Sequence, residues 1–272
     1  MSDWENAEGE HWATNADRYT RVLRHYGALL VDALAPSPGE RVLDVGCGNG
    51  DVALAVGAAV APDGAVVGVD LSPDMLAVAR SRAEHAGLDH VELIQADASR
   101  WRTPTDPFDA ATSRFGVMFF DDPVAAFANL RASLAPGARF VFACWQSLFD
   151  NEWMFLPAAA VAEVLPLPVP ADPHAPSPFA FADRDRVAAL LGEAGFAGVD
   201  IEGVTAPVWV GNDAEDAARF LETTGMGRVL FAEAAPEVVA DAMARAADAV
   251  RPHETPDGIE LSGAAWLVRA TA

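Results

Sequence analysis

The sequence contains no lysine: its 18 basic residues are all arginine. This absence excludes Schiff-base catalysis, covalent attachment of pyridoxal phosphate and a Walker-type phosphate loop, because each of these needs a lysine side chain. Cysteine is almost as scarce. Cys47 and Cys144 are too few for a disulfide framework or a cysteine-rich zinc site, and they favour a reducing environment.

Positive charge is also in short supply. The 18 basic residues face 40 acidic ones, which gives a formal net charge of −22. Such a charge repels a phosphate backbone, and affinity for nucleic acid rests mainly on cationic contacts to that backbone. We therefore expect no nucleic-acid partner and a preference for cationic ligands.

Long apolar runs are missing as well. No stretch reaches the about 18 apolar residues that a membrane-spanning helix needs, so no membrane partner is expected. Residues 1–5 have neither the basic start nor the apolar run of a signal peptide, and we expect a cytoplasmic protein. With 272 residues, of which 51% are hydrophobic, the chain can bury a full core, which excludes disordered and collagen-like classes.

Short β-rich runs alternate with helical patterns between residues 40 and 145, which is typical of βαβ units around a parallel sheet. The predicted strands cover 41–45, 65–70, 91–95, 108–112 and 139–145. The clearest helix begins at Ser72, an N-cap residue followed by Pro73, and stops at Gly87. An apolar stripe predicts the next helix; it consists of Phe127, Leu130 and Leu134.

The second half of the chain mixes irregular and regular patterns. Seven prolines lie between Pro157 and Pro178, so this stretch is too irregular for a regular element and too apolar for a plain linker. We interpret it as a lid. Beyond it, the predicted helices cover 183–194, 213–224 and 236–250, and the predicted strands cover 199–204 and 264–270.

The first predicted strand leads into a glycine-rich turn, residues 44–50, which reads Asp-Val-Gly-Cys-Gly-Asn-Gly. Glycines at a strand-to-helix turn let a ligand approach the backbone, and the N–H groups at the start of the next helix can bind an anionic group. A dinucleotide fingerprint needs a glycine where Asp51 stands, and an acid there is unfavourable near a pyrophosphate. The turn therefore suits a ligand with a carboxylate and, near Asp44, a cationic group.

Two further acids follow the next two predicted strands. Asp70 closes the second strand, where a carboxylate can accept hydrogen bonds from both ribose hydroxyls, and Asp97 follows the third, placed for the exocyclic amine of an adenine. A carboxylate at a strand end is often only a helix cap, and this alternative stays open for both residues. Together with Asp44, they suit a cationic amino acid joined to an adenosine.

These segments, in this order, resemble the motifs of the class I S-adenosylmethionine-dependent methyltransferases of the small-molecule type. The matching segments are VLDVGCGNG at 42–50, VVGVDLSPDML at 66–76, QADA at 95–98, FDAATSRFGVMFF at 108–120 and LAPGARFVFACW at 134–145. The resemblance implies S-adenosyl-L-methionine as the cofactor and S-adenosyl-L-homocysteine as its product. It implies cofactor contacts at Asp44, Gly46, Cys47, Gly48, Asn49, Asp70, Leu71, Met75, Asp97, Ala98 and Arg114.

The fold that the resemblance implies is an α/β fold, with a Rossmann-like, seven-stranded, mostly parallel sheet that has helices on both faces and an antiparallel last strand. Residues 1–272 then form a single methyltransferase domain. Its expected parts are an N-terminal helical cover over 1–35, a cofactor-binding core over 36–145, a lid over 146–182 and the C-terminal half of the sheet over 183–272, with a helical insertion at 207–260.

The expected reaction is in-line transfer of a methyl group to an apolar or aromatic small molecule, either a specialised metabolite or a quinone-like acceptor. The candidates for acceptor binding are Trp12, Phe115, Met118, Phe119 and Trp153. His11 and Tyr19 are the candidates for a general base, and a surface histidine and a packed tyrosine are the alternatives. No metal site is expected, because Asp122 before Pro123 is interpreted as a helix N-cap.

Two other functions remain open. An NAD(P)-dependent oxidoreductase shares the strand, the glycine turn and the ribose acid, although Asp51 disfavours it. A methyltransferase-like protein that binds the cofactor without catalysis would carry the same motifs. The number of subunits is also open, with a homodimer as one option.

Overall fold

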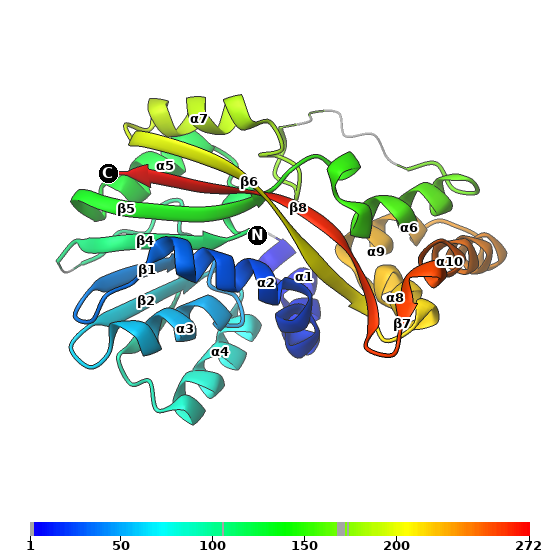
Figure 1. Ribbon diagram of the computed structural model, residues 1–272, viewed down its shortest axis with the longest axis horizontal. Helices are drawn as coiled ribbons and strands as arrows, with labels where there is room; N and C mark the ends of the chain where they lie inside the picture. Colours follow the sequence, from blue (N-terminus) through cyan, green and yellow to red (C-terminus); the bar gives the residue numbers. More distant parts are fainter. Residues whose placement is uncertain (1–2, 105, 168–171, 173) are drawn as a thin grey trace.

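The structure, a computed structural model, describes residues 3–104, 106–167, 172 and 174–272. At its centre is a mixed sheet with the strand order β3, β2, β1, β4, β5, β8, β6 (Figure 1). The strands are β1 (Arg41–Val45), β2 (Ala65–Asp70), β3 (Val91–Gln95), β4 (Phe108–Arg114), β5 (Leu134–Trp145), β6 (Ala197–Gly211) and β8 (Gly258–Thr271). The last strand, β8, runs antiparallel to both β5 and β6. The short β7 (Glu254–Thr255) pairs with β8 as an eighth strand, so the predicted fold class is confirmed with one small addition.

Helices cover both faces of this sheet. One face carries α2 (Ala16–Leu34), α3 (Asp51–Val60) and α4 (Pro73–Ala86), and the other carries α5 (Pro123–Arg131) and α7 (Arg184–Glu193). Successive side chains of a strand point to opposite faces, and β1 shows the result. Val42 packs with the apolar side chains of α3 and α4, whereas Leu43 packs with those of α5 and α7. The core is therefore an apolar layer on each side of one sheet.

The two longest strands reach beyond the parallel part of the sheet. β6 and β8 stay paired from Ala197 opposite Thr271 to Gly211 opposite Ile259, and helices gather at their far end (Figure 1). We call these helices the helical lobe; it consists of α6 (Glu152–Ala162), α8 (Ala214–Thr223), α9 (Gly225–Phe231) and α10 (Pro236–Val250). Val161 and Ala246 belong to a separate apolar core that holds the lobe together.

The first α-helix, α1 (Ala7–Thr14), lies between the sheet and the helical lobe (Figure 1). We refer to α1 and α2 together as the two-helix cover. Gly9 is buried against the turn between β2 and α4, and a Cβ atom there would clash with Ser72 Oγ and the carbonyl oxygen of Trp4. Only a glycine allows such a close approach, so Gly9 sets how tightly the cover sits over the carboxyl end of β2.

Two predicted helix caps are confirmed. Ser72 Oγ accepts the Met75 N–H at 3.2 Å at the start of α4, and Asp122 Oδ1 accepts the Ala125 N–H at 3.0 Å at the start of α5. Each cap of this kind stabilises a helix by about 1 kcal/mol. None of the helices in the described part of the chain combines the length and the apolarity needed to cross a membrane.

Several predicted boundaries are wrong. The strands expected at 199–204 and 264–270 are longer, because β6 and β8 hydrogen-bond to each other beyond the sheet. Leu134 opens β5, and the helix before it already ends at Arg131. The segment expected to be irregular contains α6, with Pro157 inside it, while residues 168–171 and 173 of the expected lid lie outside the described residues. Residues 225–231 form a further helix that no pattern predicted.

Candidate functional site

The glycine turn connects β1 to α3 at the carboxyl edge of the sheet. Gly46, Gly48 and Gly50 have φ angles of 65°, 54° and 85°, in the left-handed region that favours glycine. The Gly46 N–H donates to the Val69 carbonyl oxygen at 2.8 Å, and the Gly48 N–H donates to Asp70 Oδ2 at 2.8 Å. The turn is therefore folded against the end of β2.

Asp44, the last but one residue of β1, is almost completely buried. Its Oδ2 atom has no hydrogen-bond partner among the described residues. Burial raises the pKa of Asp44 to about 7, and the Arg114 guanidinium opposes that rise. A buried carboxylate oxygen without a donor is costly unless a ligand supplies one. Asp44 is thus suited to a cationic ligand group.

Asp70 is held by the backbone around it. Its Oδ2 atom accepts from Gly48, and its Oδ1 atom accepts from the Ser72 N–H at 2.9 Å. Burial raises the pKa of Asp70, and these two N–H groups partly offset the rise. Each carboxylate oxygen has a second lone pair, so Asp70 is oriented and still able to accept further hydrogen bonds.

Asp97 follows β3 and caps its own turn. Its Oδ1 atom accepts both the N–H and the hydroxyl of Ser99, at 2.9 and 2.6 Å. Its Oδ2 atom lies 3.6 Å from Arg100 Nε, and the side chain is 42% exposed. Asp97 thus caps a turn and not a helix, because no helix lies among the described residues between β3 and β4, and its exposed carboxylate remains accessible to a ligand.

The other predicted cofactor contacts have different surroundings. Met75 is buried next to the turn, with its Cε atom 2.6 Å from where a Cβ of Gly48 would stand, while Leu71 is half-buried and Ala98 is buried. Cys47 packs its sulfur against Gly68 of β2, and burial raises the pKa of the thiol. These contacts place Met75 at the turn and direct the Cys47 side chain into the core.

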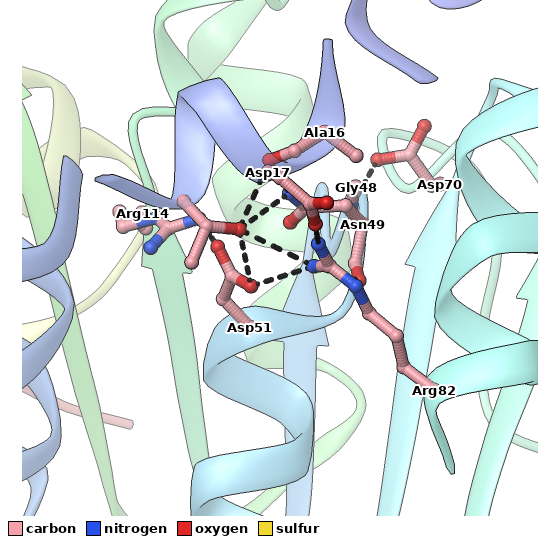
Figure 2. A network of polar contacts seen from close by, with 9 residues as sticks. Ala16, Asp17, Gly48, Asn49, Asp51, Asp70, Arg82 and Arg114 are labelled. Atoms are coloured by element: carbon pink, nitrogen blue, oxygen red, sulfur yellow. Dashed lines mark hydrogen bonds and ion pairs between the residues drawn. The ribbon is translucent and has the colours of Figure 1, made fainter. Parts of the chain in front are cut away.

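Arg114, at the end of β4, pairs with Asp51 (Figure 2). Arg114 Nη2 lies 2.9 Å from Asp51 Oδ2, and Asp51 Oδ1 accepts from Arg82 Nη1 at 2.8 Å and from the Thr20 hydroxyl at 2.9 Å. Asn49, also predicted as a cofactor contact, donates to the Ala16 carbonyl oxygen at 3.1 Å. The sequence pattern pointed to Asp51 only as an obstacle to a pyrophosphate. It gave no sign of Thr20 or Arg82, each 31 residues away along the chain.

The two candidate bases are partners of each other. His11 Nε2 lies 3.0 Å from Tyr19 Oη. The Asn15 amide nitrogen donates to the His11 carbonyl oxygen at 2.9 Å and lies 3.3 Å from His11 Nδ1. Nδ1 therefore faces a donor, which favours the tautomer with the imidazole proton on Nε2, pointing at Tyr19. Burial lowers the pKa of His11 and raises that of Tyr19, which keeps both neutral near pH 7.

The predicted acceptor residues fall into two aromatic groups. The first, here the Trp12 group, consists of Trp4, His11, Trp12, Tyr19, Phe119 and Phe220. In this group the Trp12 and Tyr19 rings stack with centroids 3.5 Å apart and planes 4° apart. Phe119 joins through Trp4, whose ring centroid lies 5.0 Å away. The Trp12 group thus brings residues of the cover, the loop after β4 and the helical lobe together.

The second group, here the Trp145 group, consists of Tyr26, Phe115, Trp145 and Trp153. Phe115 stacks on Trp145 with centroids 3.9 Å apart, and Met118 is buried, where its sulfur accepts the Trp145 N–H at 3.4 Å. Phe115 has a φ of +63°, and strained non-glycine residues of this kind cluster at functional sites. Trp145 was not predicted, although its place at the carboxyl end of β5 was an available signal.

The two-helix cover is also tied to the helical lobe. Arg18 Nη1 lies 3.0 Å from Asp216 Oδ1, and Arg18 Nη2 donates to the Val210 carbonyl oxygen at 2.6 Å. The same guanidinium lies 4.0 Å from the centre of the Phe220 ring. Arg228 of α9 pairs with Glu8 of α1. The cover therefore connects the edge of the sheet to the lobe.

This edge fits the cofactor that the sequence motifs imply. The unpaired oxygen of Asp44 matches an ammonium group, and Asp70 keeps acceptor capacity for ribose hydroxyls. The glycine turn lets the methionine part of such a cofactor approach the backbone closely. The residues present are therefore compatible with S-adenosylmethionine.

Comparison with known proteins gives the same answer. Residues 42–137 match the family described as methyltransferase domain. The chain is 37% identical over 116 residues to aklanonic acid methyltransferase DauC of Streptomyces sp. (strain C5), which covers 43% of this chain and 53% of that relative. It is 30% identical over 177 residues to a demethylmenaquinone methyltransferase of Geobacillus kaustophilus (strain HTA426), covering 61% of this chain and 75% of the relative. The chain thus spans about half the length of the first of these relatives.

A solved structure shows the same fold. Phosphoethanolamine N-methyltransferase 2 of Haemonchus contortus, in complex with S-adenosyl-L-methionine, superposes with a TM-score of 0.58 at 16% sequence identity. The match covers 95% of this chain and 57% of that one. At this identity the likeness extends to the fold.

Proposed function

Because this chain belongs to the S-adenosylmethionine-dependent methyltransferases, we propose that it transfers a methyl group from this cofactor to an apolar or aromatic small molecule. The observation that carries the proposal is the buried Asp44 oxygen without a hydrogen-bond donor, next to a glycine turn and one strand away from Asp70. A site for a cationic adenosine derivative needs both acids at this edge of the sheet.

A quinone-like acceptor is the substrate class that we propose. The Trp12 and Trp145 groups together contain ten rings, nine aromatic rings and the His11 imidazole, and include Phe115 and Trp145 where β4 and β5 end. Stacked rings of this kind favour a planar, apolar ligand. The names of the two relatives specify aklanonic acid and demethylmenaquinone as what those proteins methylate. Both observations support an acceptor with an aromatic or quinone ring.

The proposed site works mainly by positioning. The cofactor, when bound, supplies a methyl group on a positively charged sulfur. Asp44 and Asp70 orient its two ends, and the two-helix cover shields the edge of the sheet from water. Alignment in a water-poor site is the largest contribution that a protein can make to an in-line displacement.

A base is needed only where the acceptor atom must lose a proton. We propose the His11 and Tyr19 pair for that step, in the tautomer of His11 whose proton is on Nδ1: Tyr19 passes its own proton to His11 Nε2 while its oxygen takes the proton of the acceptor, which leaves an imidazolium and a neutral tyrosine. The Asn15 amide opposes this route, because it favours the tautomer in which Nε2 already carries a proton. The rate acceleration from this pair should therefore lie at the lower end of the range for general-base catalysis.

His11→Ala should lower kcat by about 100-fold if the pair removes a proton from the acceptor. Since burial lowers the pKa of His11, kcat of the wild-type chain should rise with pH through a value below the usual range of histidine. A pH profile of both proteins checks this. An unchanged kcat would restrict His11 and Tyr19 to packing.

Turnover tests the proposal as a whole. The chain is incubated with S-adenosylmethionine labelled with tritium on its methyl group and with a panel of quinone and phenol acceptors. Label in the organic phase, with stoichiometric release of S-adenosylhomocysteine, is the expected result. Binding of S-adenosylhomocysteine without transfer to any acceptor would favour the alternative of a cofactor-binding protein without catalysis.

A further inference from the structure

Asp51 stands at the meeting point of four elements. It is the first residue of α3, and its two carboxylate oxygens take donors from α2, α4 and β4 (Figure 2). The donors are the Thr20 hydroxyl at 2.9 Å, Arg82 Nη1 at 2.8 Å and Arg114 Nη2 at 2.9 Å. The Asp51 side chain is 16% exposed, so these contacts are only weakly screened by water.

On one side, this arrangement fastens the cover to the glycine turn. Thr20 is on α2, and Arg82 also reaches Asp17 of α2 at 2.7 Å. Asn49 of the turn adds its bond to the Ala16 carbonyl oxygen and accepts from Arg82 Nη1 through its own carbonyl oxygen at 3.3 Å. The first turn of α2 is thus attached directly to the turn that would cradle the cofactor.

On the other side, Asp51 fixes the position of Arg114. The Arg114 side chain is 11% exposed and its guanidinium lies beneath α2, where a Cβ on Gly27 would stand 3.1 Å from Arg114 Nη1. The positive charge of Arg114 also acts on Asp44, where it opposes the rise that burial causes in the pKa of that carboxyl. Without Asp51, the Arg114 guanidinium would lose its ion-pair partner at this buried position.

We propose that Asp51 is a positioning residue for cofactor binding: its carboxylate fastens the two-helix cover to the glycine turn and holds the Arg114 guanidinium in place beneath α2. The proposal rests on the proposed function, because it needs the cofactor at Asp44 and Asp70. When the cover opens, the bond from Thr20 to Asp51 and the bond from Asn49 to the Ala16 carbonyl oxygen must break. The bonds of Asp51 to Arg82 and Arg114 join residues that all lie outside the cover, so opening does not break them. Asp51 should therefore govern how long the cofactor stays bound.

The test is the dissociation rate of S-adenosylhomocysteine, measured by stopped-flow displacement, together with amide hydrogen exchange of residues 7–34. Asp51→Asn should raise the dissociation rate by about tenfold or more and speed exchange at the start of α2. Thr20→Val removes the contacts of the Thr20 hydroxyl with Asp51, Asn49 and Arg82 but leaves both arginine pairs of Asp51, so it should raise the dissociation rate by a smaller factor. If Asp51→Asn does not fold, Thr20→Val alone carries the test of the cover.

Asp17→Asn is the matched control, because Asp17 binds the same Arg82 but is fully exposed. Its dissociation rate should stay within about twofold of that of the wild type. Equal dissociation from the wild type and from both Asp51→Asn and Thr20→Val would overturn the role of Asp51. Loss of global stability in these variants without faster dissociation would overturn it as well. Failure of the wild-type chain to bind S-adenosylhomocysteine would instead overturn the proposed function.

Discussion

The glycine turn and the two-helix cover lie against each other but are held in different ways. In the turn, backbone atoms make the contacts: glycine N–H groups donate to Val69 and Asp70, and three positive φ angles shape the loop. In the cover, side chains make them, through Thr20, Arg18 and Glu8. The turn depends on having no side chain at particular positions, whereas the cover depends, besides its glycine at Gly9, on particular polar and charged side chains.

This difference indicates a division of labour. A backbone turn is rigid and insensitive to salt, which suits a cofactor site that has to be formed before binding. Ion pairs that are partly exposed are weaker, exchange partners and are screened by salt, which suits a segment that has to open and close. Substitutions in the turn should therefore cost stability, whereas those in the cover should change local opening.

The largest effect is expected for Gly50→Ala. Gly50 has a φ of 85°, and an added Cβ would stand 2.9 Å from Ala79 Cβ and 2.8 Å from Leu54 Cδ1. Backbone strain together with overpacking should lower the free energy of unfolding by about 2–4 kcal/mol, measured by urea denaturation. Gly87→Ala is the control, since Gly87 has a φ of 67° but open space around it. Gly87→Ala should lower the free energy of unfolding by only about 1 kcal/mol, because it adds backbone strain without overpacking. Equal losses in both variants would contradict the packing argument.

The next effect concerns Asp44 and the affinity for S-adenosylhomocysteine. Asp44→Asn should weaken binding by about 1.5–3 kcal/mol, because a charge-assisted hydrogen bond to the ammonium group is lost. In the wild-type chain, affinity should rise by about tenfold between about pH 5.5 and about pH 8, as Asp44 ionises. Titration calorimetry across this range measures both. An affinity that is independent of pH in the wild type would remove Asp44 from the cofactor site.

Ionisation of Asp44 should strengthen cofactor binding but should lower the free energy of unfolding. Its pKa is about 7 in the folded chain, above that of an exposed aspartate, so the folded chain holds this proton more tightly than the unfolded chain. The contribution of Asp44 to stability is then fully present below about pH 4 and is lost as the pH rises towards 7. Asp44→Asn should flatten the fall in unfolding free energy over this range. A slope as steep as that of the wild type would assign the effect to other groups, such as Asp70.

A smaller effect is expected where the cover meets the helical lobe. Arg18→Met removes an ion pair to Asp216 and the contact with the Phe220 ring, which should cost about 1–2 kcal/mol of local stability. Hydrogen exchange of residues 214–223 should be faster, and the effect should shrink at high salt. Arg24→Met is the control, because the pair of Arg24 with Glu260 is largely exposed. An equal increase in the hydrogen-exchange rate of residues 214–223 in Arg24→Met would show that only the loss of a positive charge matters, and not the contacts of Arg18.

No effect is expected from metal removal. In the described parts of the chain, no group of three or more His, Cys, Asp or Glu side chains is placed to hold a metal ion, and Asp122 caps α5. Methyl transfer should therefore be unchanged after extensive treatment with EDTA. Loss of activity that magnesium restores would contradict this prediction and make Asp121 and Asp122, the two adjacent acids before Pro123, candidates for a metal site.

The parts of the fold that were predictable from sequence are those with local signals. Ser72 with Pro73, and Asp122 with Pro123, mark helix starts through their own side chains, and the alternation of apolar runs marks the parallel strands. The far halves of β6 and β8 have no such signal, since their pairing depends on each other rather than on local pattern. α6 was missed for another reason: Pro157 inside it, and the further prolines that follow it, suggested an irregular segment.

The same distinction between local signals and tertiary packing applies to the candidate site. Asp44 and Asp70 were predictable because strand order and register place the ends of β1 and β2 together. The partners of Arg114 and of His11 were not, since they depend on how α1 and α2 lie over the sheet. Gly9 shows this clearly: it decides how closely the cover approaches Ser72, yet nothing around it in the sequence marks it.

The central claim is that the acids at the ends of β1 and β2 form a site for S-adenosylmethionine. Titration calorimetry of the wild-type chain with S-adenosylhomocysteine, and in parallel with NADH and NADPH, tests it most directly. The account predicts binding of S-adenosylhomocysteine, no comparable binding of either nicotinamide, and a loss of about 1.5–3 kcal/mol in Asp70→Ala. Binding of a nicotinamide dinucleotide in place of S-adenosylhomocysteine, or an unchanged affinity in Asp70→Ala, would contradict it.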